Sequence, residues 1–133
     1  MIEFHLDRRS GVAPYLQLVQ QVKHALRLGF LQPGDQLPTV REVVARIVIN
    51  PNTVFKAYRE LEREGLVESR PGLGTFVHKT LAGPSLAQHE ALRSSLLQWL
   101  HSAYEARLDA ESIVALFTDT LHQVQREVEA TAG

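Results

Sequence analysis

A short run of amide, hydroxyl and basic side chains lies between residues 50 and 59. Asparagine amides can pair with two atoms of adenine in the major groove, and lysine and arginine bind phosphate oxygens. Because Asn-Pro is a typical helix start, these side chains are expected on the first turns of a helix, where free backbone amides also favour phosphate. The candidate DNA-contacting residues of this run are Asn50, Asn52, Thr53, Lys56 and Arg59.

A second candidate contact lies in the run Arg70-Pro71-Gly72-Leu73-Gly74, which separates two short strand-like runs at 66–69 and 75–78. Glycines at Gly72 and Gly74 allow the tight tip of a β-hairpin. Arg70 and the backbone of the two glycines would let this hairpin lie against the minor groove or a phosphate. The glycines are also required by turn geometry alone.

The elements that must position these residues are predicted by apolar spacing. Apolar residues recur every three or four positions and predict helices over about 14–29, 39–47 and 51–64, the second of them opened by a Thr39–Glu42 capping box. About three residues separate the last two helices, which is typical of a helix-turn-helix. Alternation at 2–6 predicts an edge strand. The fold class is therefore mainly α with a small β-wing, a winged helix-turn-helix over residues 1–79.

The remainder of the chain predicts a linker at 80–85 and a two-helix segment at 86–133. Gly83-Pro84 is the most linker-like sequence of the chain. Two long amphipathic helices cannot cover each other's apolar stripes completely, so we expect a second copy of the chain as partner. A small-molecule effector is a further candidate ligand of this segment. The candidate dimerisation residues are Leu92, Leu96, Trp99, Leu100, Ile113, Phe117, Leu121 and Val124.

Charge divides the chain at the same place. Residues 1–80 hold eleven Lys and Arg against eight Asp and Glu, whereas residues 81–133 hold three against seven, so a net charge of +3 is followed by −4. A basic part followed by an acidic part indicates that the first faces a polyanion. The absence of cysteine, of a signal sequence and of a long apolar run indicates a cytoplasmic protein with no membrane contact.

The residue types and their spacing give little support to an enzymatic function. The sequence has no phosphate-binding loop and no nucleophile triad, and its histidines are scattered. His101, Asp119 and His122 could converge between the last two helices, but without a further ligand they do not predict a metal site. We therefore expect no catalytic residue, no metal and no cofactor.

The first 78 residues resemble the GntR family of bacterial transcription regulators, and the small two-helix tail resembles its short YtrA-like branch. The resemblance rests on the segments 14–17, 31–41, 49–54, 61–67 and 72–77, which read PYLQ, LQPGDQLPTVR, INPNTV, LEREGLV and GLGTFV. It implies a homodimeric repressor that binds an inverted-repeat operator in double-stranded DNA, and it places a DNA-contacting arginine at Arg41. Many members carry a basic residue where Pro51 or Phe55 stands here, which implies a smaller base-reading set, and Val48 replaces a common glycine.

An alternative remains open. The charge of +3 is low for a DNA-binding domain, so the winged fold could instead serve as a protein-interaction module. The two functions differ in their salt dependence, because phosphate contacts make affinity fall steeply with salt concentration.

Overall fold

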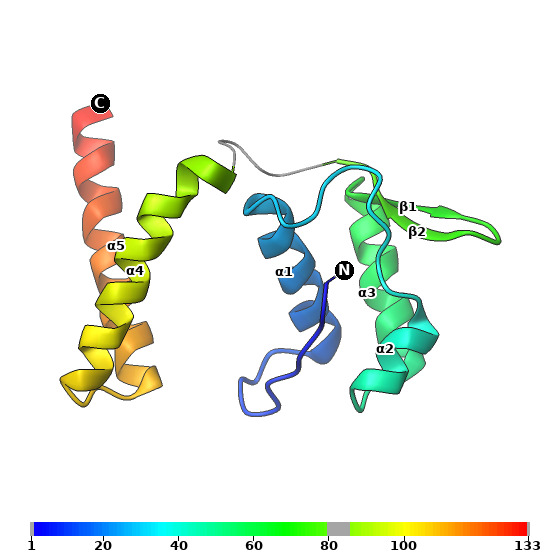
Figure 1. The fold of residues 1–133 in the computed structure, drawn as a ribbon, viewed down its shortest axis with the longest axis horizontal. Coiled ribbons are helices and arrows are strands. Elements are labelled where there is room, and N and C mark those ends of the chain that lie inside the picture. The colour runs from blue at the N-terminus through cyan, green and yellow to red at the C-terminus, as the bar shows by residue number, and fades with distance from the viewer. Residues whose placement is uncertain (1, 80–85, 133) are drawn as a thin grey trace. The chain divides into compact units, whose positions relative to one another are not determined.

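A computed structural model describes residues 2–79 and 86–132 and divides the chain into two compact units, Met1–His89 and Glu90–Gly133. The predicted linker at 80–85 lies outside the described residues. The mainly helical fold with a small wing is confirmed (Figure 1). In chain order the elements are α1 (Pro14–Arg27), α2 (Val40–Arg46), α3 (Pro51–Arg63), β1 (Val67–Arg70), β2 (Gly74–Val77), α4 (Leu86–Glu105) and α5 (Ala110–Ala132).

Local capping determines where the helices of the first unit begin. The Thr39 hydroxyl accepts a hydrogen bond from the Glu42 amide (3.1 Å), and the Glu42 carboxylate accepts one from the Thr39 amide (3.3 Å). This capping box satisfies two amides that the first turn of α2 leaves without helical partners. The predicted bounds of α1, α2 and α3 are confirmed to within two residues.

The wing is an antiparallel pair of strands covered along its second edge by the chain that leads into α2. Val67 pairs with Val77, and Arg70 pairs with Gly74 at the tip. The Leu37 amide donates to the Thr75 carbonyl (2.9 Å), and the Val77 amide donates to the Asp35 carbonyl (2.7 Å). Because β2 is hydrogen-bonded on both sides, the wing is fixed to the same chain segment that opens α2.

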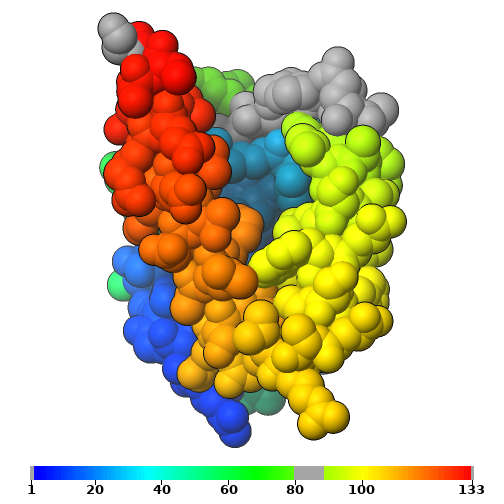
Figure 2. Space-filling model, turned by 90° about the vertical axis from the view of Figure 1, so that its left-hand side faces the viewer, coloured from blue at the N-terminus to red at the C-terminus, as the bar shows by residue number. Residues whose placement is uncertain are grey.

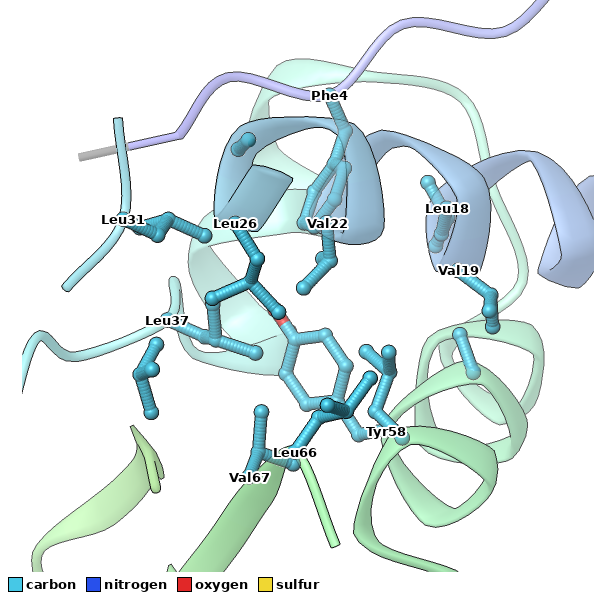
Figure 3. Close-up of a cluster of buried hydrophobic side chains, with 14 of the residues drawn as sticks. Phe4, Leu18, Val19, Val22, Leu26, Leu31, Leu37, Tyr58, Leu66 and Val67 are labelled. Carbon is cyan, nitrogen blue, oxygen red and sulfur yellow. The ribbon is translucent and has the colours of Figure 1, made fainter. Parts of the chain in front are cut away.

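The core of the first unit lies between α1, α3 and the wing. Leu18, Val22 and Leu26 of α1 are fully buried, as are Val54 and Leu61 of α3. The ring of Tyr58 reaches from α3 into the centre of this cluster (Figure 3). The apolar stripe predicted for α3 is therefore the face that packs, and most of the stripe predicted for α1 is buried with it.

The predicted strand at 2–6 is wrong. The segment is extended, but no strand pairs with it within the described residues. Phe4 is buried, and Ile2 and Leu6 pack against the core. The alternation of apolar residues at 2–6 therefore reflects packing against the core and not pairing with a strand. The Gln21 side chain takes the place of a strand, because its amide donates to the His5 carbonyl (2.7 Å) and its carbonyl accepts from the His5 amide (3.1 Å).

Gln17, the one buried polar side chain described, holds the turn that follows. Its Nε2 donates to the carbonyls of Asp7 and Val12, both at 2.9 Å, and its Oε1 accepts from the Asp7 amide at 2.8 Å.

Replacing Gln17 by Leu should lower the free energy of unfolding by about 2–3 kcal/mol, because backbone groups of the turn lose their partners. Urea unfolding measures this, with exposed Gln20→Leu on the same helix as control; equal stability of the two variants would contradict it.

In the second unit, α4 and α5 meet at the turn between them and separate away from it (Figure 2). Ala103 and Ile113, on either side of that turn, are the buried hydrophobic residues described here. The Asp109 side chain caps α5 by accepting from the Ser112 amide (2.8 Å), and hydrogen bonds from the Ser112 side chain and from this amide lower the pKa of the carboxyl. Within the described residues, eleven large apolar side chains of this unit stay exposed: Leu92, Leu96, Leu97, Trp99, Tyr104, Val114, Leu116, Phe117, Leu121, Val124 and Val128.

Candidate nucleic-acid interface

One face of α3 points away from the core and carries most of the predicted contacts. Asn52, Lys56 and Arg59 are exposed, whereas Val54, Ala57 and Leu61 on the opposite face are buried. Spacings of three and four residues place the three polar side chains in one row along the helix. Phe55, half exposed, lies in the same row.

The start of α3 is built by the residues that were expected to read bases there. The Asn50 side-chain oxygen Oδ1 accepts a hydrogen bond from the Asn52 backbone amide (2.8 Å), and Pro51 occupies the first helical position. Asn50 is therefore a cap, which leaves its NH2 group as the part free to meet a base. Thr53 is half-buried beneath this turn, so its position favours support over contact.

Within residues 2–79 and 86–132, Arg41 and Arg59 form neither an ion pair nor a cation–π contact, in contrast to Lys56, Arg63 and Arg70. Arg41 lies in the first turn of α2 and Arg59 lies two turns into α3, and both side chains are exposed. An uncompensated guanidinium group keeps its full charge for a phosphate or the edge of a guanine.

The other cations near this face already have partners. Arg70 lies 2.7 Å from the Glu68 carboxylate and 4.4 Å from the centre of the Phe76 ring. Its hydrogen bond lowers the pKa of the Glu68 carboxyl. The ammonium group of Lys56 lies 4.1 Å from the centre of the Tyr15 ring of α1. Binding DNA would require Arg70 to leave or share its carboxylate, whereas a cation–π contact leaves the charge of Lys56 available.

The charge of Arg63 is neutralised by an ion pair within its own helix. Its Nε donates to the Glu60 carboxylate at 3.0 Å, one turn back on α3. That hydrogen bond lowers the pKa of the Glu60 carboxyl and raises the pKa of the Arg63 guanidinium. Exposed pairs of this kind contribute little to stability, but they reduce the positive charge that the face presents.

A groove of about 250 Å³ joins the three parts of the interface. Thr39 and Val40 at the start of α2, Phe55 and Arg59 of α3, and Thr75 of the wing line it, together with Pro38, Tyr58, Glu62, Ser69 and Gly74. Arg41 follows Val40 directly in the chain. Of the predicted contacts, Arg59 and Gly74 line this concave surface, which lies between the start of α2, α3 and the wing.

Two residues that the sequence did not single out hold these parts together. The buried Tyr58 hydroxyl donates to the Pro38 carbonyl at 2.6 Å, which ties the entry of α2 to α3, and burial raises the pKa of this hydroxyl. The Gln36 amide donates to the Leu73 carbonyl at the wing tip (3.2 Å). A Cβ on Gly74 would lie 2.6 Å from Gln36 Nε2, at the end of a side chain that can move aside, so it is the φ of +129° that requires glycine here.

Known proteins resemble this chain over both units. Residues 14–77 match the family described as bacterial regulatory proteins, gntR family. Over 127 residues the chain is 37% identical to the HTH-type transcriptional repressor YtrA of Bacillus subtilis (strain 168), which covers 94% of this chain and 91% of that repressor. The chain belongs to the GntR family. Its similarity to YtrA over both units agrees with the expected YtrA-like branch.

Two solved structures of related proteins share the GntR architecture. A transcriptional antiterminator from Listeria monocytogenes EGD-e aligns with a TM-score of 0.57 at 31% identity and covers 90% of each chain. YtrA from Sulfolobus acidocaldarius, a GntR-family transcription factor, aligns with a TM-score of 0.52 at 26% identity, over 92% of this chain and 99% of that one.

GntR membership makes this chain a transcription regulator with a winged helix-turn-helix DNA-binding domain, and not an enzyme. No described helix combines the length and the apolar character needed to cross a membrane. Among the described residues, no three acidic or histidine side chains converge as metal ligands would.

Proposed function

We propose that two copies of this chain bind an inverted-repeat operator in double-stranded DNA and repress transcription from it. Each copy would place α3 in the major groove of one half-site. The observation that carries the proposal is the outward row of α3, which exposes Asn52 and the unpaired Arg59, with Arg59 lining the groove shared with α2 and the wing. Such a target places the protein in the cytoplasm.

The proposed contacts differ in kind. Arg41 and Arg59 bind phosphate or a guanine edge, because their charges are uncompensated within the fold. Asn52 reads a base, while Asn50 and Thr53 support the helix start that presents it. Lys56 binds a backbone phosphate from the side of α1. Arg70 and the backbone of Gly72 and Gly74 bring the wing against the flanking minor groove.

The apolar side chains that α4 and α5 leave exposed support the proposed dimer. Leu96, Trp99, Leu116 and Phe117 line an apolar groove of about 280 Å³ between α4 and α5, and Trp99 and Phe117 are 38% and 49% exposed. Apolar surface of this extent is unfavourable in water unless another surface covers it. A second copy presents the same open helix pair, so the two can cover each other around a two-fold axis.

The proposed dimerisation residues have unequal parts in such an interface. Ile113 is buried and Leu100 is half-buried in one copy, so these two are less available to a second copy. The exposed members, which are available to the second copy, are Leu92, Leu96, Trp99, Phe117, Leu121 and Val124.

Protein interaction is the competing function, and one observation favours it. Phe55, Val48 and Leu73 expose apolar side chains on α3, on the turn before it and at the wing tip. A methyl group of thymine can take up such side chains, and so can an apolar surface of another protein.

Selection of bound DNA from a random duplex pool tests the proposal. The purified protein is incubated with the pool at two salt concentrations, and the recovered sequences are aligned. We expect an inverted repeat whose affinity falls steeply with salt. Recovery of no sequence at low salt would contradict operator binding and favour the protein-interaction function.

A further inference from the structure

The N-terminal segment, defined here as residues 2–12, is fastened to α1 along its length. Phe4 is 9% exposed within the core cluster. Gln21 pairs with both backbone groups of His5, and Gln17 holds the turn that follows through Asp7 and Val12. The segment is thus anchored by α1 and not by a sheet.

From this anchored position the segment contacts the end of α2 and the turn between α2 and α3. The Glu3 carboxylate lies 3.1 Å from the Arg46 guanidinium, at the last residue of α2. The Arg8 guanidinium donates to the carbonyl oxygen of Val48, inside the turn. Val48 lies two residues before Asn50, whose Oδ1 caps α3.

Ile47 and Ile49 of the turn pack against the core, whereas Val48 between them is held through its backbone carbonyl. Ile47 has extended backbone (φ −130°, ψ 153°), and the Val48 side chain is 85% exposed. A hydrogen bond from a charged donor is stronger than one between neutral groups, so Arg8 can fix the Val48 carbonyl even near solvent. Only Ile49 separates Val48 from the Asn50 cap, so added motion of this carbonyl is expected to extend to the first turn of α3.

We propose that Arg8 is a positioning residue for DNA binding. It holds the turn so that α3 begins in the orientation that its contacts require, without itself touching DNA. The inference rests on the proposed operator binding. An arginine that acts in this way should affect affinity and the local motion of the free protein, but not the number of phosphates bound.

The test compares Arg8→Ala with Arg9→Ala. The control removes the same charge from the next residue, whose exposed side chain has no hydrogen bond or ion pair within residues 2–79 and 86–132. Relative to Arg9→Ala, we expect Arg8→Ala to bind the selected operator about fivefold more weakly, the effect of one lost hydrogen bond. Its slope of log affinity against log salt should equal that of the control, and Arg8→Lys should restore part of the affinity.

Amide hydrogen exchange in the free protein separates this inference from operator binding itself. Exchange at Ile49, Asn52 and Thr53 should be faster in Arg8→Ala than in Arg9→Ala, while thermal unfolding of the two variants coincides. Equal exchange and equal affinity would overturn the positioning role, as would a lower salt slope in Arg8→Ala alone, which would make Arg8 a phosphate contact. Failure of the unmodified protein to bind any duplex would instead overturn the proposed function.

Discussion

Replacing Arg41 by Ala is expected to lower affinity for the selected operator by about 100-fold or more. A bidentate arginine contact contributes about 1–3 kcal/mol, and a dimer would lose it in both half-sites. Arg41 is exposed in the first turn of α2 and has no ion pair among the described residues, so its removal leaves no buried group unsatisfied. Fluorescence anisotropy with the labelled operator measures the change.

Arg63→Ala is the matched control for Arg41→Ala. It removes the same charge from the same domain, but from a side chain already paired with Glu60. We expect its affinity to stay within about threefold of the unmodified protein, as for a surface pair that contributes under about 1 kcal/mol. Operator affinity retained by Arg41→Ala, or an equal loss in both variants, would contradict the role given to Arg41.

A glutamate at Phe117 is expected to separate the dimer and reduce operator affinity by about 100-fold or more. The side chain is 49% exposed in one copy, so the substitution leaves the isolated helix pair intact. In the dimer it would bury an unpaired charge, which costs several kcal/mol. Each separated copy would then bind one half-site alone. Linkage of two copies on two half-sites raises the affinity by about 10²–10⁴-fold, and this gain would be lost.

The measurement for Phe117→Glu is mass in solution by sedimentation, followed by operator titration. Ala115→Glu serves as the control, because Ala115 is exposed two residues away and projects from another side of α5. The control should keep the mass of two copies and the affinity of the unmodified protein. A Phe117→Glu protein that still sediments as a pair would show that another surface joins the copies.

The features that could be predicted from the sequence are those determined by interactions between residues close together in the chain. The Thr39–Glu42 box and the Asn50 cap act within three residues, so the starts of α2 and α3 follow from the residue types and their spacing. The glycines of the wing similarly indicate a tight hairpin. These signals also place Asn52 and Arg59 on one exposed row of α3.

Contacts between distant segments could not be predicted in this way. Alternation at 2–6 correctly marks Phe4 as buried, but the same pattern arises whether the hydrogen bonds go to a strand or to the Gln21 side chain. Nothing local indicates that Arg46 forms an ion pair with Glu3, which lies 43 residues away in the chain. The support of the turn by Arg8 spans forty residues and has no local signal.

The two-helix segment shows the limit of apolar patterning. Its spacing predicts which side chains face a partner, but not whether that partner is the neighbouring helix or another chain. Ile113 and Phe117 belong to one stripe of α5, and only the structure separates the buried first from the exposed second.

The central claim is that two copies read one two-fold-symmetric site, and the mass of the complex on the selected duplex tests it most directly. Native mass spectrometry of protein with a duplex that carries both half-sites, and with one that carries a single half-site, counts the copies bound. We predict two copies on the full site, with half-site centres about 34 Å or a whole number of helical turns apart. One copy on an asymmetric site would contradict the account.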